Sequence, residues 1–238
     1  MQYSAFCIPK LNMTQVIVCS THEGIVLATD SCATWFDQTG GMRHFNLKKL
    51  LRLSSHSAIV SAGEGIGVEI SIAFQEFLQR QRQEDIDQIA RSALPFFTEH
   101  YGMWLNRREK DPLPSRTGSE EIEEETPFLP GVYLILAGYS FRDRARPYHL
   151  YLFASGVDRT SIKIHPASQI IVIPRSLSME RRLEAQCEEG SSLDHLLSMC
   201  KSFLRRRSDE EEEVGPPFFF ATITPIGYKE VIEEEVNE

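Results

Sequence analysis

The sequence predicts an α+β fold in four layers, a sandwich of two antiparallel sheets flanked by helices on both outer faces. Short apolar segments come in consecutive pairs joined by tight turns, which implies antiparallel hairpins. Two pairs of helix-like segments interrupt the strands, and an antiparallel sheet buries one face only, so stacked sheets need helices on their outer faces. With 238 residues, 42% of them hydrophobic, the chain can build one sizeable core.

Two hairpins open the predicted domain. The segments Gln15–Ser20 and Ile25–Asp30 are rich in Val, Ile and Leu and carry little charge, so both are expected to be buried on two faces. The turn between them contains Gly24, which permits a tight reversal. A second pair, Lys49–Leu53 and Ser57–Ala62, follows in the same manner.

The hydrophobic period then changes from that of a strand to that of a helix. After residues 63–65 one apolar stripe recurs at helical spacing, at Ile66, Ile70, Phe74, Phe77 and Leu78. A second helix is expected from about Asp85 to Trp104, with a bend at Pro95. Several prolines and an acidic run follow, and we expect a mobile acidic loop over about 107–130 inside a single domain of residues 14–238.

The second half of the chain repeats the pattern of strands, two helices and strands. Two further hairpins are expected, the first around the turn Arg142–Arg146, then two helices, and finally a closing strand pair followed by an acidic C-terminal tail. The expected segments are, in order, Val132–Ala137, Tyr148–Ala154, Ser161–His165, Gln169–Ile173, Ser178–Cys187, Leu193–Arg206, Phe218–Thr224 and Tyr228–Ile232.

Composition excludes several classes of protein. The net charge is −9, and the acidic runs Glu120–Glu125, Asp209–Glu213 and Glu233–Glu238 would repel a phosphate backbone, so no nucleic-acid partner is expected. The longest apolar runs are shorter than a membrane helix requires, and the N-terminus lacks the features of a secretory signal, so we expect no membrane partner and a cytoplasmic location.

The sequence also lacks the signatures of metal, nucleotide and serine-hydrolase sites. Five cysteines form no CxxC pair and seven histidines form no HxH or HExxH pair, so no metal site is expected. The glycines at 63, 65 and 67 are spaced too closely for a dinucleotide loop, and no cofactor is expected. No serine stands in a GxSxG frame.

The segment from Thr14 to Thr34 resembles the start of a mature proteasome β-type subunit and of its bacterial relatives, which are N-terminal-nucleophile (Ntn) hydrolases. In that family a Thr opens the first strand, and a strand similar to GIVLATD delivers an Asp sixteen residues later, the spacing of Thr14 and Asp30. A Lys pair follows in the family, matched by Lys48-Lys49, and then an Ala-Gly turn, matched by Ala62-Gly63. The resemblance covers nearly the whole chain in element order and is specific over Thr14 to Gly67.

The resemblance implies that Thr14, Asp30 and Lys49 are catalytic, and elementary chemistry agrees. A Thr hydroxyl is a weak nucleophile and needs a base within hydrogen-bond reach. If residue 14 becomes the first residue, its own α-amino group is that base, with an unperturbed pKa of about 7.7–8.0. The Lys49 ammonium would lower the pKa of this amine, and Asp30 would pair with Lys49 and keep it charged.

Further site residues follow from the same resemblance. The backbone N–H of Gly63 would stabilise the oxyanion, and Thr34 and Gly63 would bind the substrate backbone as an added strand. Ser61 matches a position that shapes the family's S1 pocket, and its small side chain indicates a roomy pocket. Ser176 lies in roughly the region of a family turn that buttresses the nucleophile, and it is a substitute candidate for that turn.

The resemblance implies a threonine endopeptidase subunit of a self-compartmentalising assembly. Polypeptides would be its substrates, copies of the chain would form a homo-oligomeric ring or spiral, and an ATP-dependent unfoldase would be a partner. Peptide-amide chemistry of the amidase or ligase type is a further function of the same fold, because an acyl-enzyme reacts with amines as well as with water.

The residues before Thr14 leave an alternative open. Residues 1–13 form an extension or propeptide that ends at Met13, where proteasome precursors usually have Gly. Translation starting at Met13, followed by removal of that Met, would free the amine as processing would. If the extension is retained, Thr14 is blocked, and the protein is a catalytically inactive structural subunit of a proteasome-like assembly.

Overall fold

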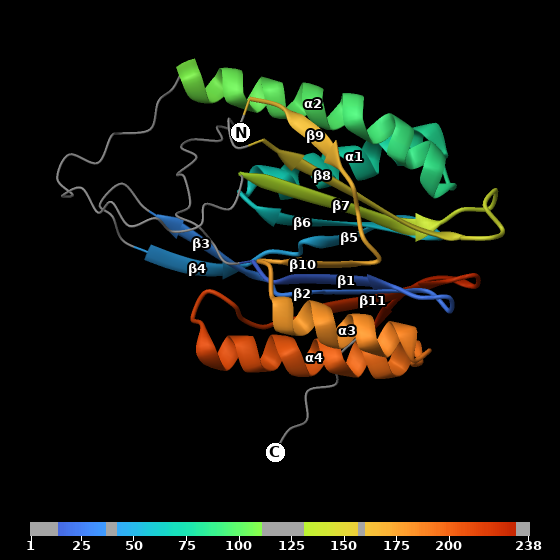
Figure 1. The fold of residues 1–238 in the computed structure, drawn as a ribbon. Coiled ribbons are helices and arrows are strands. Elements are labelled where there is room, and N and C mark those ends of the chain that lie inside the picture. The colour runs from blue at the N-terminus through green and yellow to red at the C-terminus, as the bar shows by residue number, and fades with distance from the viewer. Residues whose placement is uncertain (1–13, 37–41, 111–130, 157–159, 232–238) are drawn as a thin grey trace.

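The computed structural model of the protein describes residues 14–36, 42–110, 131–156 and 160–231. It is an α+β structure with two large antiparallel sheets and four helices (Figure 1). Three sequence expectations lie outside the described residues: the N-terminal extension 1–13, the acidic part of the loop from 111 to 130, and the acidic tail from 232 to 238.

The first sheet has five strands in the order β10-β1-β2-β11-β12, and every neighbouring pair is antiparallel. Its central strands, β1 and β2, are buried along their whole length, as the apolar sequence predicts. The strands span Val16–Ser20 (β1), Ile25–Thr29 (β2), Ile170–Ile173 (β10), Phe219–Thr224 (β11) and Gly227–Val231 (β12).

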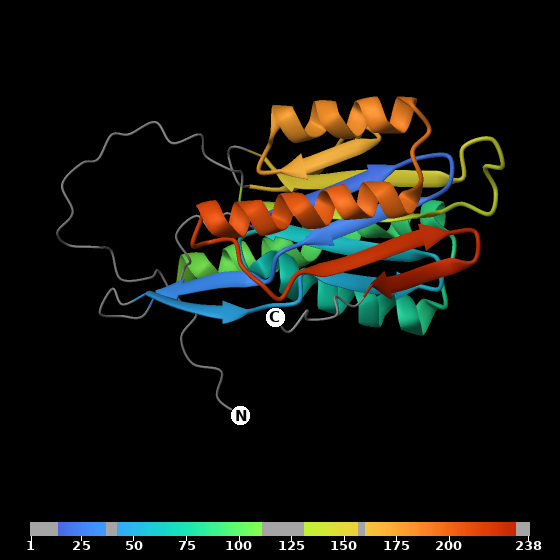
Figure 2. The same cartoon turned by 90° about the horizontal axis from the view of Figure 1, so that it is seen from below.

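The second sheet has five strands in the order β5-β6-β7-β8-β9, again antiparallel throughout. Its strands span Leu50–Ser54 (β5), Ser57–Gly63 (β6), Val132–Tyr139 (β7), Tyr148–Ser155 (β8) and Ile162–His165 (β9). A separate two-stranded ribbon, Cys32–Phe36 (β3) paired with Met42–Asn46 (β4), extends beyond one end of the two sheets (Figures 1 and 2).

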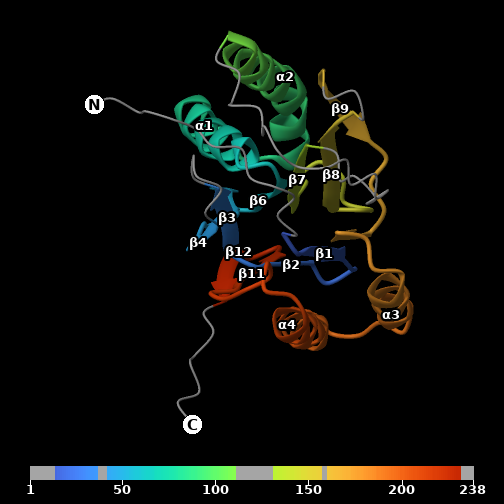
Figure 3. The ribbon, with the colours of Figure 1, turned by 90° about the vertical axis from the view of Figure 1, so that its left-hand side faces the viewer.

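The helices cover the outer faces of the sheets in two pairs. Helices Ile66–Gln81 (α1) and Ile86–Lys110 (α2) lie on the second sheet, and Leu177–Glu188 (α3) and Leu193–Glu210 (α4) lie on the first (Figure 3). Helix α4 begins after Ser192, whose hydroxyl accepts a hydrogen bond from the His195 N–H and so caps the first turn.

Three apolar layers hold these elements together. The layer between the sheets contains Val18, Leu27, Val60 and Ile135, all without solvent exposure. The other two layers lie between each sheet and its helices. In this way the apolar faces of the central strands and of the four helices are buried against one another, which is the expected driving force for the layered arrangement.

The structure corrects the expected hairpin of Ser161–His165 with Gln169–Ile173. The first segment is β9 and pairs with β8 in the second sheet, while the second is β10 and pairs with β1 in the first sheet. All four residues of β10 are buried, whereas β9 buries only Ile162. The chain therefore crosses from the second sheet to the first between β9 and β10. There β10 forms the edge strand of the first sheet, and its apolar side chains are buried.

One further expectation differs from the structure. Helix α2 continues to Lys110, so the first residues of the expected loop 107–130 are helical. The helix runs through Pro95, as expected, and its apolar face stays buried on both sides of that residue, at Ala93 and Phe97. Among the described residues no helix is both long and apolar enough to cross a lipid bilayer.

Candidate active site

The register of the first hairpin brings the start of β1 beside the end of β2. Val16 pairs with Thr29, so the residues just outside that pair, Gln15 and Asp30, are also opposite each other. The Gln15 N–H donates to Asp30 Oδ1 at 3.0 Å, and the Asp30 N–H donates to the Gln15 carbonyl at 3.2 Å. Thr14 is thereby held next to the Asp30 carboxylate and is almost fully buried.

Lys49 reaches the same point from the second sheet. It directly precedes β5, and its carbonyl accepts a hydrogen bond from the Ser61 N–H of β6 at 3.0 Å. The Lys49 ammonium donates to Thr14 Oγ1 at 3.0 Å and contacts both carboxylate oxygens of Asp30, at 3.1 and 3.2 Å. It also donates to the Cys32 carbonyl at 2.6 Å, so all its protons have acceptors.

The ion pair between Lys49 and Asp30 is buried, with side-chain exposures of 4% and 0%. Burial raises the pKa of Asp30 to about 6, against the opposing pull of the Lys49 ammonium and of the hydrogen bonds to the carboxylate. Burial likewise lowers the pKa of Lys49, against the opposing effect of Asp30. Desolvation therefore brings both groups closer to neutrality than they would be in water, while the charge of each partner opposes that shift.

The raised pKa of Asp30 predicts how replacing it changes stability with pH. In the wild type the unfolded chain loses this proton near its ordinary pKa of about 3.9, and the folded chain loses it only near 6. The stabilisation from the protonated carboxyl is therefore present below about pH 4 and is lost as pH rises through 6. Relative to Asp30→Asn, the wild type should lose about 3 kcal/mol of unfolding free energy between pH 4 and pH 7.

Urea unfolding of the two proteins across this pH range measures that difference. The comparison cancels the titration of the other carboxyl groups, which both proteins share. A wild type that instead gains stability over the variant as pH rises would mean that the Lys49 ion pair outweighs burial and depresses the pKa of Asp30.

Thr14 and Lys49 face a small pocket of about 50 Å³ at the end of the sandwich where the β3–β4 ribbon emerges. One wall comes from the ribbon and the segment after it, and the other from the end of β6 and the start of α1. The remaining lining residues are Ala33, Phe45, Leu47, Ser61, Ala62, Gly63, Glu64, Gly65 and Val68. Apolar walls around a few polar groups are typical of sites that bind a small organic group.

Ser61 adds a polar group to this pocket. Its hydroxyl is buried and has no hydrogen-bond partner among the residues that the structure describes. An unpaired buried hydroxyl is costly, and a ligand that hydrogen-bonds to it removes that cost.

Gly63 makes the turn from β6 into α1 with a positive φ of 85°, a conformation that favours glycine. A Cβ atom at this position would lie 2.5 Å from the Gly131 carbonyl oxygen. Gly63→Ala should therefore destabilise the protein by about 2–5 kcal/mol, combining left-handed strain with a backbone clash. Urea unfolding measures this.

The matched control for Gly63 is Gly65→Ala. Gly65 has a φ of −56° at the start of α1, and no atom lies within 4 Å of a Cβ placed there. We expect this substitution to change stability by less than about 1 kcal/mol. Equal losses in the two variants would mean that the geometry at residue 63 is not what requires a glycine.

The structure brings together most of the residues that the sequence singled out. The Lys49 ammonium contacts both Thr14 and Asp30, and Gly63 and Ser61 line the pocket that Thr14 and Lys49 face. Thr34 is in β3, where its backbone pairs with His44, and its neighbour Ala33 lines the pocket. One candidate lies elsewhere. Ser176 is the residue before α3, with its hydroxyl 3.3 Å from the Ser178 hydroxyl, and it does not line the pocket.

Sequence reasoning missed the β3–β4 ribbon and its contributions to the site. These are the Cys32 carbonyl, which binds Lys49, and the pocket walls at Ala33, Phe45 and Leu47. A signal was present: a run containing Thr34, Trp35 and Phe36, residue types that favour strands, ends shortly before the turn-forming pair Gly40-Gly41.

No protein-family model matches the sequence, and a search of the curated proteins gives no match.

Proposed function

We propose that the protein is a threonine-type peptidase subunit of the proteasome-like Ntn-hydrolase family. The observation that carries the proposal is the position of the Lys49 ammonium, 3.0 Å from the Thr14 hydroxyl and ion-paired with the buried Asp30. Three residues separated by up to 35 positions converge at the mouth of a two-sheet sandwich, and a threonine needs such surroundings to act as a nucleophile.

The proposed reaction begins once residue 14 carries a free α-amino group. That amine takes the proton of the Thr14 hydroxyl while Oγ1 attacks the carbonyl carbon of a peptide bond, forming a tetrahedral oxyanion. The oxyanion collapses, the C–N bond breaks, and the protonated amine returns its proton to the leaving nitrogen. Water, deprotonated by the same amine, then attacks the ester carbonyl, the bond to Oγ1 breaks, and the amine returns the proton to Oγ1 as the second product leaves.

The surrounding groups have supporting parts in this proposal. The positive charge of Lys49 lowers the pKa of the α-amine and so keeps more of it neutral at pH 7, and Asp30 holds Lys49 in place. The backbone N–H of Gly63 is the proposed oxyanion donor. Substrate would add as an extended strand between the backbones of Thr34 and Gly63, with Ser61 offering its unpaired hydroxyl to a substrate side chain.

The proposal extends to the setting in which the subunit works. Polypeptides are the substrates, and copies of the chain assemble into a ring or spiral that encloses the sites. An ATP-dependent unfoldase in the cytoplasm would deliver the substrates. These statements rest on the resemblance of the sequence to the proteasome family.

A structural subunit without activity is the second candidate, and one observation favours it. In the sequence as given, Met13 precedes Thr14, so the nitrogen of Thr14 is part of a peptide bond and cannot serve as the base. Retention of residues 1–13 would keep the site inert while the sandwich remains folded.

The experiment that separates the two candidates is an intact-mass measurement on the protein purified from its source cells. The peptidase proposal predicts a chain that begins at Thr14. A parallel test fuses residues 14–238 behind a cleavable tag whose removal leaves Thr14 first, and then assays hydrolysis of a fluorogenic peptide series. A native chain that retains residues 1–13, together with no hydrolysis by the chain that begins at Thr14, would overturn the proposal.

A further inference from the structure

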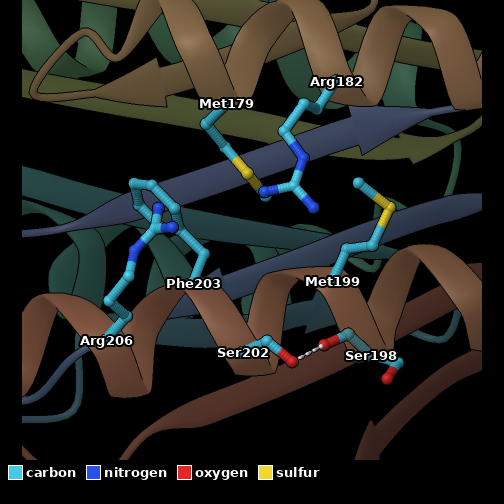
Figure 4. A pocket seen from close by; sticks show the side chains of 7 residues that line it. All are labelled: Met179, Arg182, Ser198, Met199, Ser202, Phe203 and Arg206. Atoms are coloured by element: carbon cyan, nitrogen blue, oxygen red, sulfur yellow. Dashed lines mark hydrogen bonds between the residues drawn. The ribbon is translucent and has the colours of Figure 1, made fainter.

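A groove of about 140 Å³ lies between α3 and α4 (Figure 4), the two helices that cover the outer side of the first sheet (Figure 3). Its apolar surface comes from Met179 of α3 and from Met199 and Phe203 of α4. A volume of this size accommodates one branched apolar or benzene-sized group. The groove is therefore large enough to hold one apolar side chain of a docked peptide.

Two arginines give the groove a positive rim. Figure 4 shows Arg182 reaching across from α3 and Arg206 lying against the Phe203 ring on α4, with its guanidinium carbon 5.4 Å from the ring centre. Arg206 lies 3.8 Å from Glu210 in an exposed pair, which holds it only weakly. Within the part of the chain that the structure describes, Arg182 has no carboxylate partner. The rim can therefore bind an added acidic group.

The chain supplies a segment of matching chemistry. Residues 232–238 read Ile-Glu-Glu-Glu-Val-Asn-Glu, two branched apolar residues around three consecutive carboxylates. The apolar surface of the groove would contact one apolar side chain of this segment. The two guanidinium groups of the rim would at the same time bind the neighbouring glutamates.

The described part of the chain brings this segment to the edge of the same helical layer. Val231, the last residue of β12, packs against the apolar cluster that contains Met179 and Phe203. Its strand partner is Phe220, at the start of the strand that follows α4. Seven extended residues span about 23 Å, and a helix with its side chains is about 10–12 Å across. The segment is thus long enough to cross α4 and reach the groove.

We infer that residues 232–238 dock in the α3–α4 groove of their own chain, with Val236 or Ile232 against the methionines and the glutamates against Arg182 and Arg206. Docking would cover the apolar surface of the groove. It would also link β12, the last strand, to helices α3 and α4. It does not require peptidase activity, and it places the tail on the face of the molecule remote from Lys49.

Photo-crosslinking of the full chain tests this inference. Val236 is replaced by p-benzoylphenylalanine, and crosslinked peptides are mapped by mass spectrometry. We expect crosslinks to Met179 or Met199 within one chain, at a yield independent of protein concentration. Arg182→Glu combined with Arg206→Glu should lower this yield about tenfold, and Lys at positions 233–235 in that variant should restore it.

The control is Arg181→Glu, which makes a single charge reversal at an exposed position of α3 that does not line the groove. It should leave the yield nearly unchanged. A mixture of isotopically labelled and unlabelled chains separates docking within a chain from docking between copies. Crosslinks between copies, crosslinks elsewhere on the surface, or a yield insensitive to the double reversal would each overturn the inference.

Discussion

Thr14→Ala should reduce peptide hydrolysis by at least about 10⁴-fold in a chain that begins at residue 14. The alanine keeps the α-amine, Lys49 and Asp30 but removes the only oxygen that the proposed acyl transfer uses as its nucleophile. Stability should change little, because the Thr14 hydroxyl contributes one hydrogen bond, worth about 1 kcal/mol. Steady-state kinetics on a fluorogenic peptide, together with urea unfolding, measure both effects.

Thr14→Ser is the matched control, since it keeps the hydroxyl at the same place. It should retain activity well above that of Thr14→Ala. If alanine and wild type hydrolyse peptide at similar rates, the observed activity belongs to another site or to a contaminant.

Lys49→Met should have the second largest effect, and it should act on both stability and rate. Removing the ammonium leaves the fully buried Asp30 without its ion-pair partner, which typically costs about 3–5 kcal/mol. Activity should fall by about 10³-fold, because the amine loses its electrostatic activation and the Thr14 hydroxyl loses its hydrogen bond. Unfolding experiments at pH 7 and kinetics on the same samples give the two values.

Two companion variants separate structure from chemistry. Adding Asp30→Asn to Lys49→Met removes the uncompensated charge, so stability should recover in part while activity does not. Lys48→Met is the neighbouring control: Lys48 is 42% exposed and pairs with Glu230 on the surface, so its loss should cost less than about 1 kcal/mol. A Lys48 variant as inactive as the Lys49 variant would contradict the assigned role of Lys49.

Much of the fold could be predicted because the signals are local. The change of period after Gly63 marks the passage from β6 to α1, and the apolar runs mark β1 and β2 to within a residue or two. The error at β9 and β10 has a physical cause. Periodicity shows that a segment is extended, but strand pairing depends on which sheet edge the segment can cover, and that is settled by contacts distant in sequence.

The candidate site was likewise predictable only where its contacts are local in sequence. Proximity of Thr14 to Asp30 follows from the register of a single hairpin, so residues 14–30 are sufficient to predict it. Lys49 comes from the other sheet, and its contact with Thr14 depends on how the two sheets stack, which the family resemblance implied but no local pattern could supply. The ribbon wall at Phe45 was missed because that side chain is 48% exposed and gives no core-like signal.

The most direct test of the central proposal is covalent labelling by a peptide epoxyketone, an electrophile that closes a ring with both the hydroxyl and the free amine of an N-terminal threonine. We expect a single adduct on Thr14 in the chain that begins there, lost in Thr14→Ala and strongly reduced in Lys49→Met. A chain with a free Thr14 and an intact fold that forms no adduct, or one that forms its adduct elsewhere, would contradict it.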